Sequence, residues 1–369
     1  MMGYKGLIEK YNDRLPLDEA GEKITLFEGQ TPLIELKNIE ICKSRGVKLY
    51  AKLEGLNPTG SFKDRGMTVA ITQAIREGYQ AVICASTGNT SASAAAYAAR
   101  AAIPCFVIIP SGKIALGKLA QAIAHGAVVL QISGNFDSGM GIVKELAETR
   151  GLAVVNSVNP FRLQGQKTAA FEIIEELGEA PDYHCIPVGN AGNISAYWMG
   201  FCEYSGHELS VHNRYDYSKI AVTTKRPVML GYQAEGAAPL VHGKIFDSPE
   251  TIATAIRIGN PQSLELAKAA SVQSEGWFKS LNDEEIIRNQ KLLAQKEGIF
   301  CEPASAISVG GALLDIEEGR IPEGSTVTCT LTGHGLKDPD IVIERFSTNV
   351  LEVAAERGAV ADVISRYIS

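Results

Sequence analysis

The first candidate for chemistry is a lysine that follows a turn-forming segment, residues 57–66 with the sequence NPTGSFKDRG. Pro58 and Gly60 favour a turn, and we expect Ser61 to cap a helix that follows it. Lys63 would then lie in the first turn, where the positive end of the helix dipole disfavours an ammonium ion and helps expose a neutral amine. A neutral amine attacks carbonyl groups. Taken alone, a lysine in a loop is far more often a solvated surface charge.

Two further segments place small polar residues between an apolar run and a helix, namely residues 86–90 (STGNT) and 187–193 (PVGNAGN). The N–H groups of a helix start bind anions, and glycines let the chain wrap closely around a phosphate. Neither segment matches a Walker loop or the Gly-x-Gly-x-x-Gly dinucleotide pattern. A phosphate on a smaller cofactor therefore fits better than a nucleotide. In isolation each segment could also be an ordinary helix cap.

The fourth segment is residues 331–335 (LTGHG), at the end of the last apolar run. The hydroxyl of Thr332 could bond a ring nitrogen, and the glycines would leave room for a flat ligand, although a plain turn would look the same. Two other motifs for catalysis or metal binding do not match the sequence. His207 and His212 are one residue too far apart for the zinc-binding His-Glu-x-x-His pair, and no Gly-x-Ser-x-Gly hydrolase elbow occurs.

An α/β fold with mostly parallel strands must position these segments. Nearly continuous apolar runs alternate with helical stretches, as expected for a parallel sheet that is buried on both faces. The expected strands are 49–53, 81–85, 105–109, 128–132, 153–156, 184–188, 228–235 and 326–332. The expected helices are 66–77, 90–102, 115–125, 138–150, 165–177 and 194–204, and residues 205–226 look like a surface loop or insertion.

Composition narrows the class of protein further. The length of 369 residues suggests two domains, and a net charge of −7 argues against nucleic acid or an anionic membrane as partner. The seven cysteines form no Cys-x-x-Cys pair, which favours buried free thiols in a reducing compartment. No apolar run is long enough to span a bilayer. We therefore expect a cytoplasmic protein with no bound metal.

Together, the four segments resemble the fold-type II pyridoxal-phosphate enzymes, the tryptophan synthase β-subunit family, over about residues 24–350. Within that family the decapeptide NPTGSFKDRG resembles the signature of the threonine synthases. GNAGN, residues 331–338 (LTGHGLKD) and residues 233–239 (QAEGAAP) add independent matches. The related dehydratases usually show Ser-x-Gly-Asn-His where this chain has STGNT, and many relatives have a glycine run in the phosphate loop.

The resemblance implies a role for each matching residue. Lys63 would hold pyridoxal 5′-phosphate covalently and later move protons, while Asn89 would bond the 3′ oxygen of the cofactor. Thr332 would face the pyridine nitrogen. The cofactor phosphate would lie against Gly189, Asn190, Ala191, Gly192 and Asn193. The substrate carboxylate would be held by Ser86, Thr87 and Thr90, and the substrate phosphate by Lys52, Ser157 and Arg162.

The resemblance also implies an activity and a domain plan. The activity would be that of a lyase that converts O-phospho-L-homoserine and water to L-threonine and phosphate. Residues 53–160 would form a small domain inserted into a large one made of residues 1–52 and 161–369, with the cofactor between them, in a homodimer. The alternatives are a threonine or serine dehydratase of the same fold, a non-catalytic cofactor-binding paralogue, and a purely structural protein.

Overall fold

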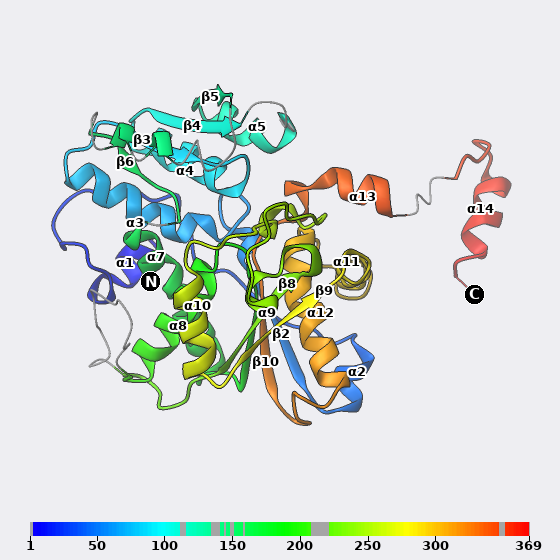
Figure 1. Ribbon diagram of the computed structural model, residues 1–369. Coiled ribbons are helices and arrows are strands. Elements are labelled where there is room, and N and C mark those ends of the chain that lie inside the picture. Colours follow the sequence, from blue (N-terminus) through cyan, green and yellow to red (C-terminus); the bar gives the residue numbers. More distant parts are fainter. Residues whose placement is uncertain are drawn as a thin grey trace. The chain divides into compact units, whose positions relative to one another are not determined.

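The computed structural model describes residues 3–110, 116–133, 141–143, 145–147, 151–157, 159–207, 221–346 and 351–368. Met1–Asp338 form one compact unit, and Pro339–Ser369 form a second. The second unit contains two helices, α13 (Pro339–Arg345) and α14 (Arg357–Ser365). Both sheets and the candidate site lie in the first unit (Figure 1). None of the described helices has the length and apolar character of a membrane span.

The larger sheet has six strands in the order β1-β2-β10-β7-β8-β9. Neighbouring strands in this sheet run parallel, except for the antiparallel pair β1 and β2. The expected, mostly parallel sheet is therefore confirmed. The sequence-based expectation missed β1 and β9, which are short or half-buried edge strands. The bounds are β1 Leu33–Glu35, β2 Lys48–Leu53, β7 Tyr183–Pro187, β8 Val228–Ala234, β9 Trp277–Leu281 and β10 Thr326–Leu331.

The smaller sheet has four parallel strands in the order β5-β4-β3-β6. Their bounds are β3 Val82–Ala85, β4 Cys105–Pro110, β5 Val128–Ile132 and β6 Ala153–Val154. All four come from the stretch that was expected to form the small domain. The proposed domain boundaries at residues 53 and 160 themselves stay a prediction.

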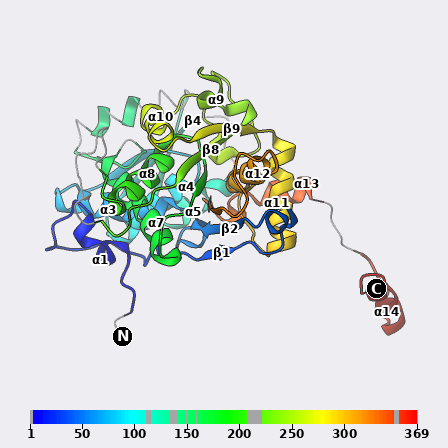
Figure 2. The same ribbon diagram turned by 90° about the horizontal axis from the view of Figure 1, so that it is seen from below.

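Helices cover both faces of the large sheet (Figures 1 and 2). One core lies between the sheet and α2, α11 and α12, and another lies between the sheet and α7, α8 and α10. A third core joins α3, α4 and α5 to the small sheet. The bounds are α1 Leu7–Lys10, α2 Glu40–Ser44, α3 Lys63–Arg76, α4 Asn89–Arg100, α5 Leu116–Ala124, α7 Pro160–Leu177, α8 Gly192–Tyr204, α9 Pro239–His242, α10 Leu264–Gln273, α11 Asp283–Glu297 and α12 Pro303–Glu317.

The helix expected over 165–177 begins five residues earlier in the structure, as α7. Pro160 occupies its first turn, and the side chain of Asn159 accepts a hydrogen bond from the Phe161 N–H at 3.0 Å. An Asn-Pro pair is a strong helix-start signal, which the apolar periodicity alone does not contain. The helix expected over 138–150 and the loop over 205–226 lie largely outside the described residues.

The expectation that Ser61 caps helix α3 is wrong. The N-cap residue is Phe62, no side chain caps the helix, and the Lys63 N–H reaches the Ser61 Oγ only at 3.4 Å. Ser61 instead pairs with Gly333 through its backbone. Lys63 is nevertheless the first residue of the helix, so the expected position of its amine in the first turn is confirmed.

Two glycines let helices α3 and α7 cross with their backbones in contact. A Cβ atom on Gly165 would lie 1.8 Å from the Arg65 carbonyl oxygen, and one on Gly66 would lie 2.8 Å from the Arg162 carbonyl oxygen. Any larger residue would force the helices apart. This crossing sets the start of α7, with Arg162, against the start of α3, with Lys63.

A buried network of charges lies beside this crossing. Arg65 donates to Glu54 at 2.7 Å and to both oxygens of Glu172 at 2.7 and 2.6 Å, while Lys52 donates to Glu172 at 2.7 Å. Burial alone would raise the pKa of Glu172, but Arg65 and Lys52 outweigh it and hold the pKa below the ordinary range. The stabilisation is therefore complete above the unfolded-state pKa and is lost as the pH falls.

Replacing Glu172 by Gln should destabilise the fold by about 3–5 kcal/mol, because it leaves two buried cations without their shared counter-charge. Urea unfolding at neutral pH measures this change. The matched control is Glu265→Gln, which removes an exposed carboxylate paired with Lys268 and should cost less than about 1 kcal/mol. An equally small cost for both variants would contradict the prediction.

Candidate active site

The lysine segment and the last strand are joined by backbone contacts. The Phe62 N–H donates to the Thr332 carbonyl at 2.9 Å, and the His334 N–H donates to the Gly60 carbonyl at 2.9 Å. Lys63 follows Phe62 directly. The structure therefore brings together the two segments that the sequence placed about 270 residues apart.

The phosphate-loop candidate lies beside Thr332 because β7 and β10 are neighbouring parallel strands, with Cys185 opposite Cys329. The loop after β7 turns at Ala191, which has a φ of 65°, and α8 begins at Gly192. The free N–H groups of this helix start point out of the helix axis, where an anion can accept them. A Cβ atom on Gly192 would lie 3.5 Å from Leu163, so the loop also adjoins the start of α7.

The segment with Asn89 reaches Thr332 through a residue that the sequence analysis missed. Asn89 opens helix α4, and its Nδ2 donates to Glu302 Oε2 at 3.1 Å. Thr332 Oγ1 donates to Glu302 Oε1 at 3.2 Å. All four candidate segments thus meet at the carboxyl ends of β3, β7 and β10, which is where open α/β sheets bind ligands.

The electrostatic surroundings of Lys63 favour its neutral form. The pKa of its amine is lowered to about 7, mainly by burial and also by the positive charge of Arg162, while Glu302 offsets part of the decrease. An ordinary lysine has a pKa near 10.4 and would be almost fully charged at neutral pH. The amine is therefore available as a nucleophile and as a base near pH 7.

Unsatisfied polar groups at this place fit a small phosphorylated cofactor. Both side-chain polar atoms of Asn193 are buried and, among the described residues, have no hydrogen-bond partner. Such groups are rare in folded proteins and often mark a ligand. A Cβ atom on Gly333 would meet the Glu302 carboxylate at 2.5 Å, so only glycine lets this carboxylate approach the end of β10. A nucleophilic amine, a phosphate cradle and a hydroxyl from Thr332 together suit pyridoxal phosphate.

The structure separates the three residues that were expected to bind a substrate phosphate. Arg162 is 1% exposed, and its Nε and Nη2 have no partner among the described residues. Ser157 donates to Gln262 at 2.8 Å, and the Gln262 N–H donates to Asn190 of the phosphate loop at 3.3 Å. Lys52 lies in the buried network, where its Nζ donates to Glu172 and to the Thr31 carbonyl. Of the three, only Arg162 and Ser157 border the site.

The hydroxyls expected to hold a substrate carboxylate lie between β3 and α4. Ser86 Oγ accepts a hydrogen bond from the Gly88 N–H at 3.2 Å, Thr87 is exposed, and Thr90 is half-buried in the first turn of α4. Asn156, which the sequence analysis did not assign, pairs with both backbone groups of Ala85 at 3.1 and 2.9 Å. This pairing fixes the place where the loop leaves β3.

The sequence did contain a signal for Glu302. An acidic residue directly before a proline, Pro303, opens the apolar helix α12, and such a residue belongs at a helix start. Its partners are 213 and 30 residues away in the chain, so nothing local indicates that it contacts Asn89 and Thr332.

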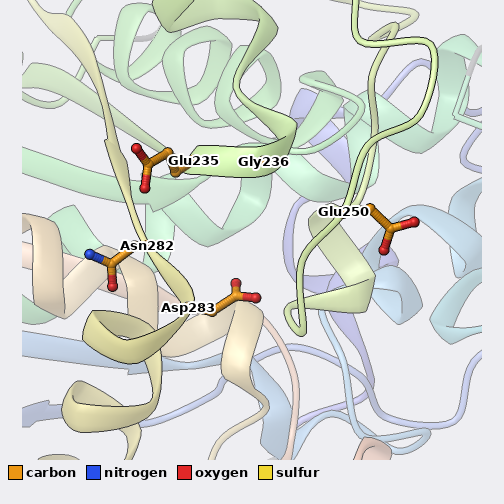
Figure 3. Close-up of a pocket in the computed structure, with 5 residues that line it drawn as sticks. All are labelled: Glu235, Gly236, Glu250, Asn282 and Asp283. Atoms are coloured by element: carbon orange, nitrogen blue, oxygen red, sulfur yellow. The ribbon is translucent and has the colours of Figure 1, made fainter.

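A separate hollow of about 340 Å³ lies after β8 and β9. Figure 3 shows its lining, which includes the carboxylates of Glu235, Glu250 and Asp283. Three carboxylates repel a phosphate, so this hollow does not suit the cofactor. Asp283 is also engaged, because it accepts hydrogen bonds from Thr251 and from the Ile252 N–H.

Comparison with known proteins shows the family of the chain. The family model described as "Pyridoxal-phosphate dependent enzyme" matches residues 24–333. A threonine synthase from Bacillus sp. (strain ULM1) is 53% identical over 352 residues, which is 95% of each chain. One from Halalkalibacterium halodurans is 52% identical, over 99% of this chain and 98% of its own.

Among solved structures, maize serine racemase matches with a TM-score of 0.69 at 20% identity and covers 94% of each chain. At that identity the match concerns the fold alone. The sequence relatives, with more than half of their residues identical over nearly their whole length, decide the family. The chain therefore belongs to the pyridoxal-phosphate dependent enzymes and, within them, to the threonine synthases.

Proposed function

We propose that this chain binds pyridoxal 5′-phosphate at Lys63 and converts O-phospho-L-homoserine and water to L-threonine and phosphate. The observation that carries the proposal is the placement of Lys63. Its amine has a pKa of about 7, and its segment is hydrogen-bonded to the Thr332 segment. The close relatives that are named threonine synthase support the same reaction.

Four parts of the site would hold the cofactor. Lys63 would bind its carbonyl carbon, residues 189–193 its phosphate, Asn89 its 3′ oxygen and Thr332 its ring nitrogen. When bound, pyridoxal phosphate supplies an electron-accepting ring that stabilises negative charge on a substrate carbon. Because Thr332 is a neutral hydroxyl and not a carboxylate, it leaves the ring nitrogen less firmly protonated.

Lys63 is also the group that moves protons. An amine with a pKa of about 7 exists in both protonation states at neutral pH, so it can accept a proton from the substrate Cα or Cβ and return it later. Arg162 would have two roles here. Together with burial, its charge lowers the pKa of the amine, and its unpartnered nitrogens are available to a phosphate.

Arg162 and Ser157 are the proposed binding groups for the substrate phosphate. A buried guanidinium with two unpartnered nitrogens costs free energy unless an anion occupies it, and a phosphate accepts from a guanidinium through two parallel bonds. Ser157 would exchange its hydrogen bond to Gln262 for one to the phosphate. Ser86, Thr87 and Thr90 remain the proposed grip on the substrate carboxylate.

Incubation of the cofactor-loaded protein with O-phospho-L-homoserine should release phosphate and threonine in equal amounts. Lys63→Ala should abolish both this activity and the visible absorbance band of the bound cofactor, because it removes the amine that would bind the cofactor covalently. Lys268→Ala, which alters an exposed lysine, is the control and should leave both unchanged.

Formation of a 2-oxo acid from threonine instead would support the dehydratase alternative. A coloured protein without turnover on either substrate would support the non-catalytic paralogue.

Arg162→Met should raise the pKa of Lys63, because it removes a positive charge that disfavours the ammonium form. The rate at which the cofactor-free protein reacts with pyridoxal 5′-phosphate, followed by absorbance, should rise with pH through a midpoint near the Lys63 pKa of about 7. In the variant the midpoint should move to higher pH. Arg288→Met removes an exposed arginine and should not move it. An unchanged midpoint in Arg162→Met would contradict the assignment.

A homodimer in the cytoplasm is also part of the proposal. The described cysteines are all free and buried, as expected for a protein of a reducing compartment. Analytical sedimentation at micromolar concentration should give twice the chain mass of 39.5 kDa. A sedimenting species of one chain mass would contradict the dimer.

A further inference from the structure

The carboxylate of Glu302 lies between Asn89, which would hold the 3′ oxygen of the cofactor, and Thr332, which would hold its ring nitrogen. One oxygen accepts from Asn89 Nδ2 at 3.1 Å, and the other accepts from Thr332 Oγ1 at 3.2 Å. Glu302 is 3% exposed, and a Cβ atom on Gly333 would lie 2.5 Å from its Cδ. The carboxylate therefore has little room to move away from either partner.

The two partners differ in how many hydrogens they can offer. The amide of Asn89 carries two, so it can serve Glu302 and a cofactor oxygen at once, but the hydroxyl of Thr332 carries only one. Ser305 Oγ lies 2.9 Å from Thr332 Oγ1 and accepts from the Gly333 N–H at 2.9 Å. An ionised Glu302 can only accept, so it takes the single Thr332 hydrogen, while Ser305 donates to the Thr332 oxygen. Thr332 then has nothing to donate to a ring nitrogen.

In an inference that rests on the proposed function, we propose that Glu302 is a positioning residue for Thr332. The protonation state of Glu302 determines whether Thr332 donates its hydrogen to the ring nitrogen of the cofactor or to the Glu302 carboxylate. A protonated Glu302 donates its O–H to the Thr332 oxygen and releases the Thr332 hydrogen toward the ring. At pH values where Glu302 is ionised in the cofactor-free protein, it takes up one proton when a ring with an unprotonated nitrogen binds.

The surroundings of Glu302 support such a proton change at moderate pH. Burial raises the pKa of Glu302, and the hydrogen bonds from Asn89 and Thr332 offset only part of the increase. The charge of Asp338 also raises the pKa, and that of Lys337 lowers it. The titratable groups that face Glu302 are Lys63, Cys301, Lys337 and Asp338. Because the pKa is raised, Glu302 still binds a proton at pH values where an ordinary glutamate is ionised.

The test uses deoxypyridoxine phosphate, an analogue that has the ring nitrogen and the phosphate but no aldehyde and so cannot react with Lys63. Its affinity for the cofactor-free protein is measured by calorimetry across pH in buffers of different ionisation enthalpy, which also counts protons taken up. For the wild-type protein, affinity should fall by up to about tenfold per pH unit above the Glu302 pKa, with uptake of about one proton.

Glu302→Gln should remove that part of the pH dependence and the matching proton uptake. A glutamine can donate to Thr332 and accept from Asn89 at every pH, so the Thr332 hydrogen is always free for the ring. The pH effect of the analogue phosphate persists in both proteins and cancels in the comparison. Glu302 also raises the pKa of Lys63, so the comparison is repeated with Lys63→Ala in both proteins, which removes that contribution. Glu250→Gln, which removes an exposed carboxylate from the hollow of Figure 3, is the matched control and should behave as the wild type.

Thr332→Val provides a second test if Glu302→Gln does not fold by circular dichroism. Without the hydroxyl, Glu302 and the ring no longer compete for one hydrogen, so the same proton uptake should disappear while affinity falls overall. Unchanged proton uptake in either folded variant would overturn the role of Glu302. Failure of the analogue to bind the wild-type protein at any pH would instead overturn the proposed function, and this inference with it.

Discussion

The hydrogen bond from the Phe62 N–H to the Thr332 carbonyl holds the site together. It fixes the first turn of α3 to the end of β10, the central strand that has β2 on one side and β7 on the other. Through β7 the same strand end adjoins the phosphate loop, and through Glu302 it adjoins Asn89. Together with the bond from the His334 N–H to the Gly60 carbonyl, it keeps the nucleophile beside its proposed cofactor contacts.

Two of the buried groups of charges have opposite properties. In the network of Arg65, Glu54, Glu172 and Lys52, each charge is compensated by a close partner, so the group stabilises the fold and has no chemical reactivity to offer. At the site, Arg162 has no carboxylate partner among the described residues, and Lys63 loses its charge near neutral pH. Uncompensated charge is therefore found where a phosphate is proposed to bind.

The sequence predicted most of the strands and the cluster of site segments because both depend on local patterns. Buried parallel strands are apolar runs, and the segments around Lys63, Asn89, Asn193 and Thr332 each stand between such a run and a helix. Whether Lys52 binds a substrate phosphate could not be judged in this way. Only the folded chain shows that its ammonium group is paired with Glu172, which lies 120 residues away in the sequence. Glu302 and Asn156 were missed for the same reason, since their meaning lies in partners distant in sequence. The half-buried edge strand β9 was missed because it has neither a continuous nor an alternating apolar pattern.

The glycine crossing of α3 and α7 has a mechanical consequence. Helix α3 packs mainly on the small sheet and α7 on the large one, and they touch at Gly66 and Gly165 through main-chain atoms. Close by, the buried side chain of Arg65 in α3 donates to Glu172 in α7. Main-chain contact resists compression of the crossing, and the buried ion pair resists rotation of one helix against the other. The starts of the two helices, which carry Lys63 and Arg162, are therefore held at a fixed spacing.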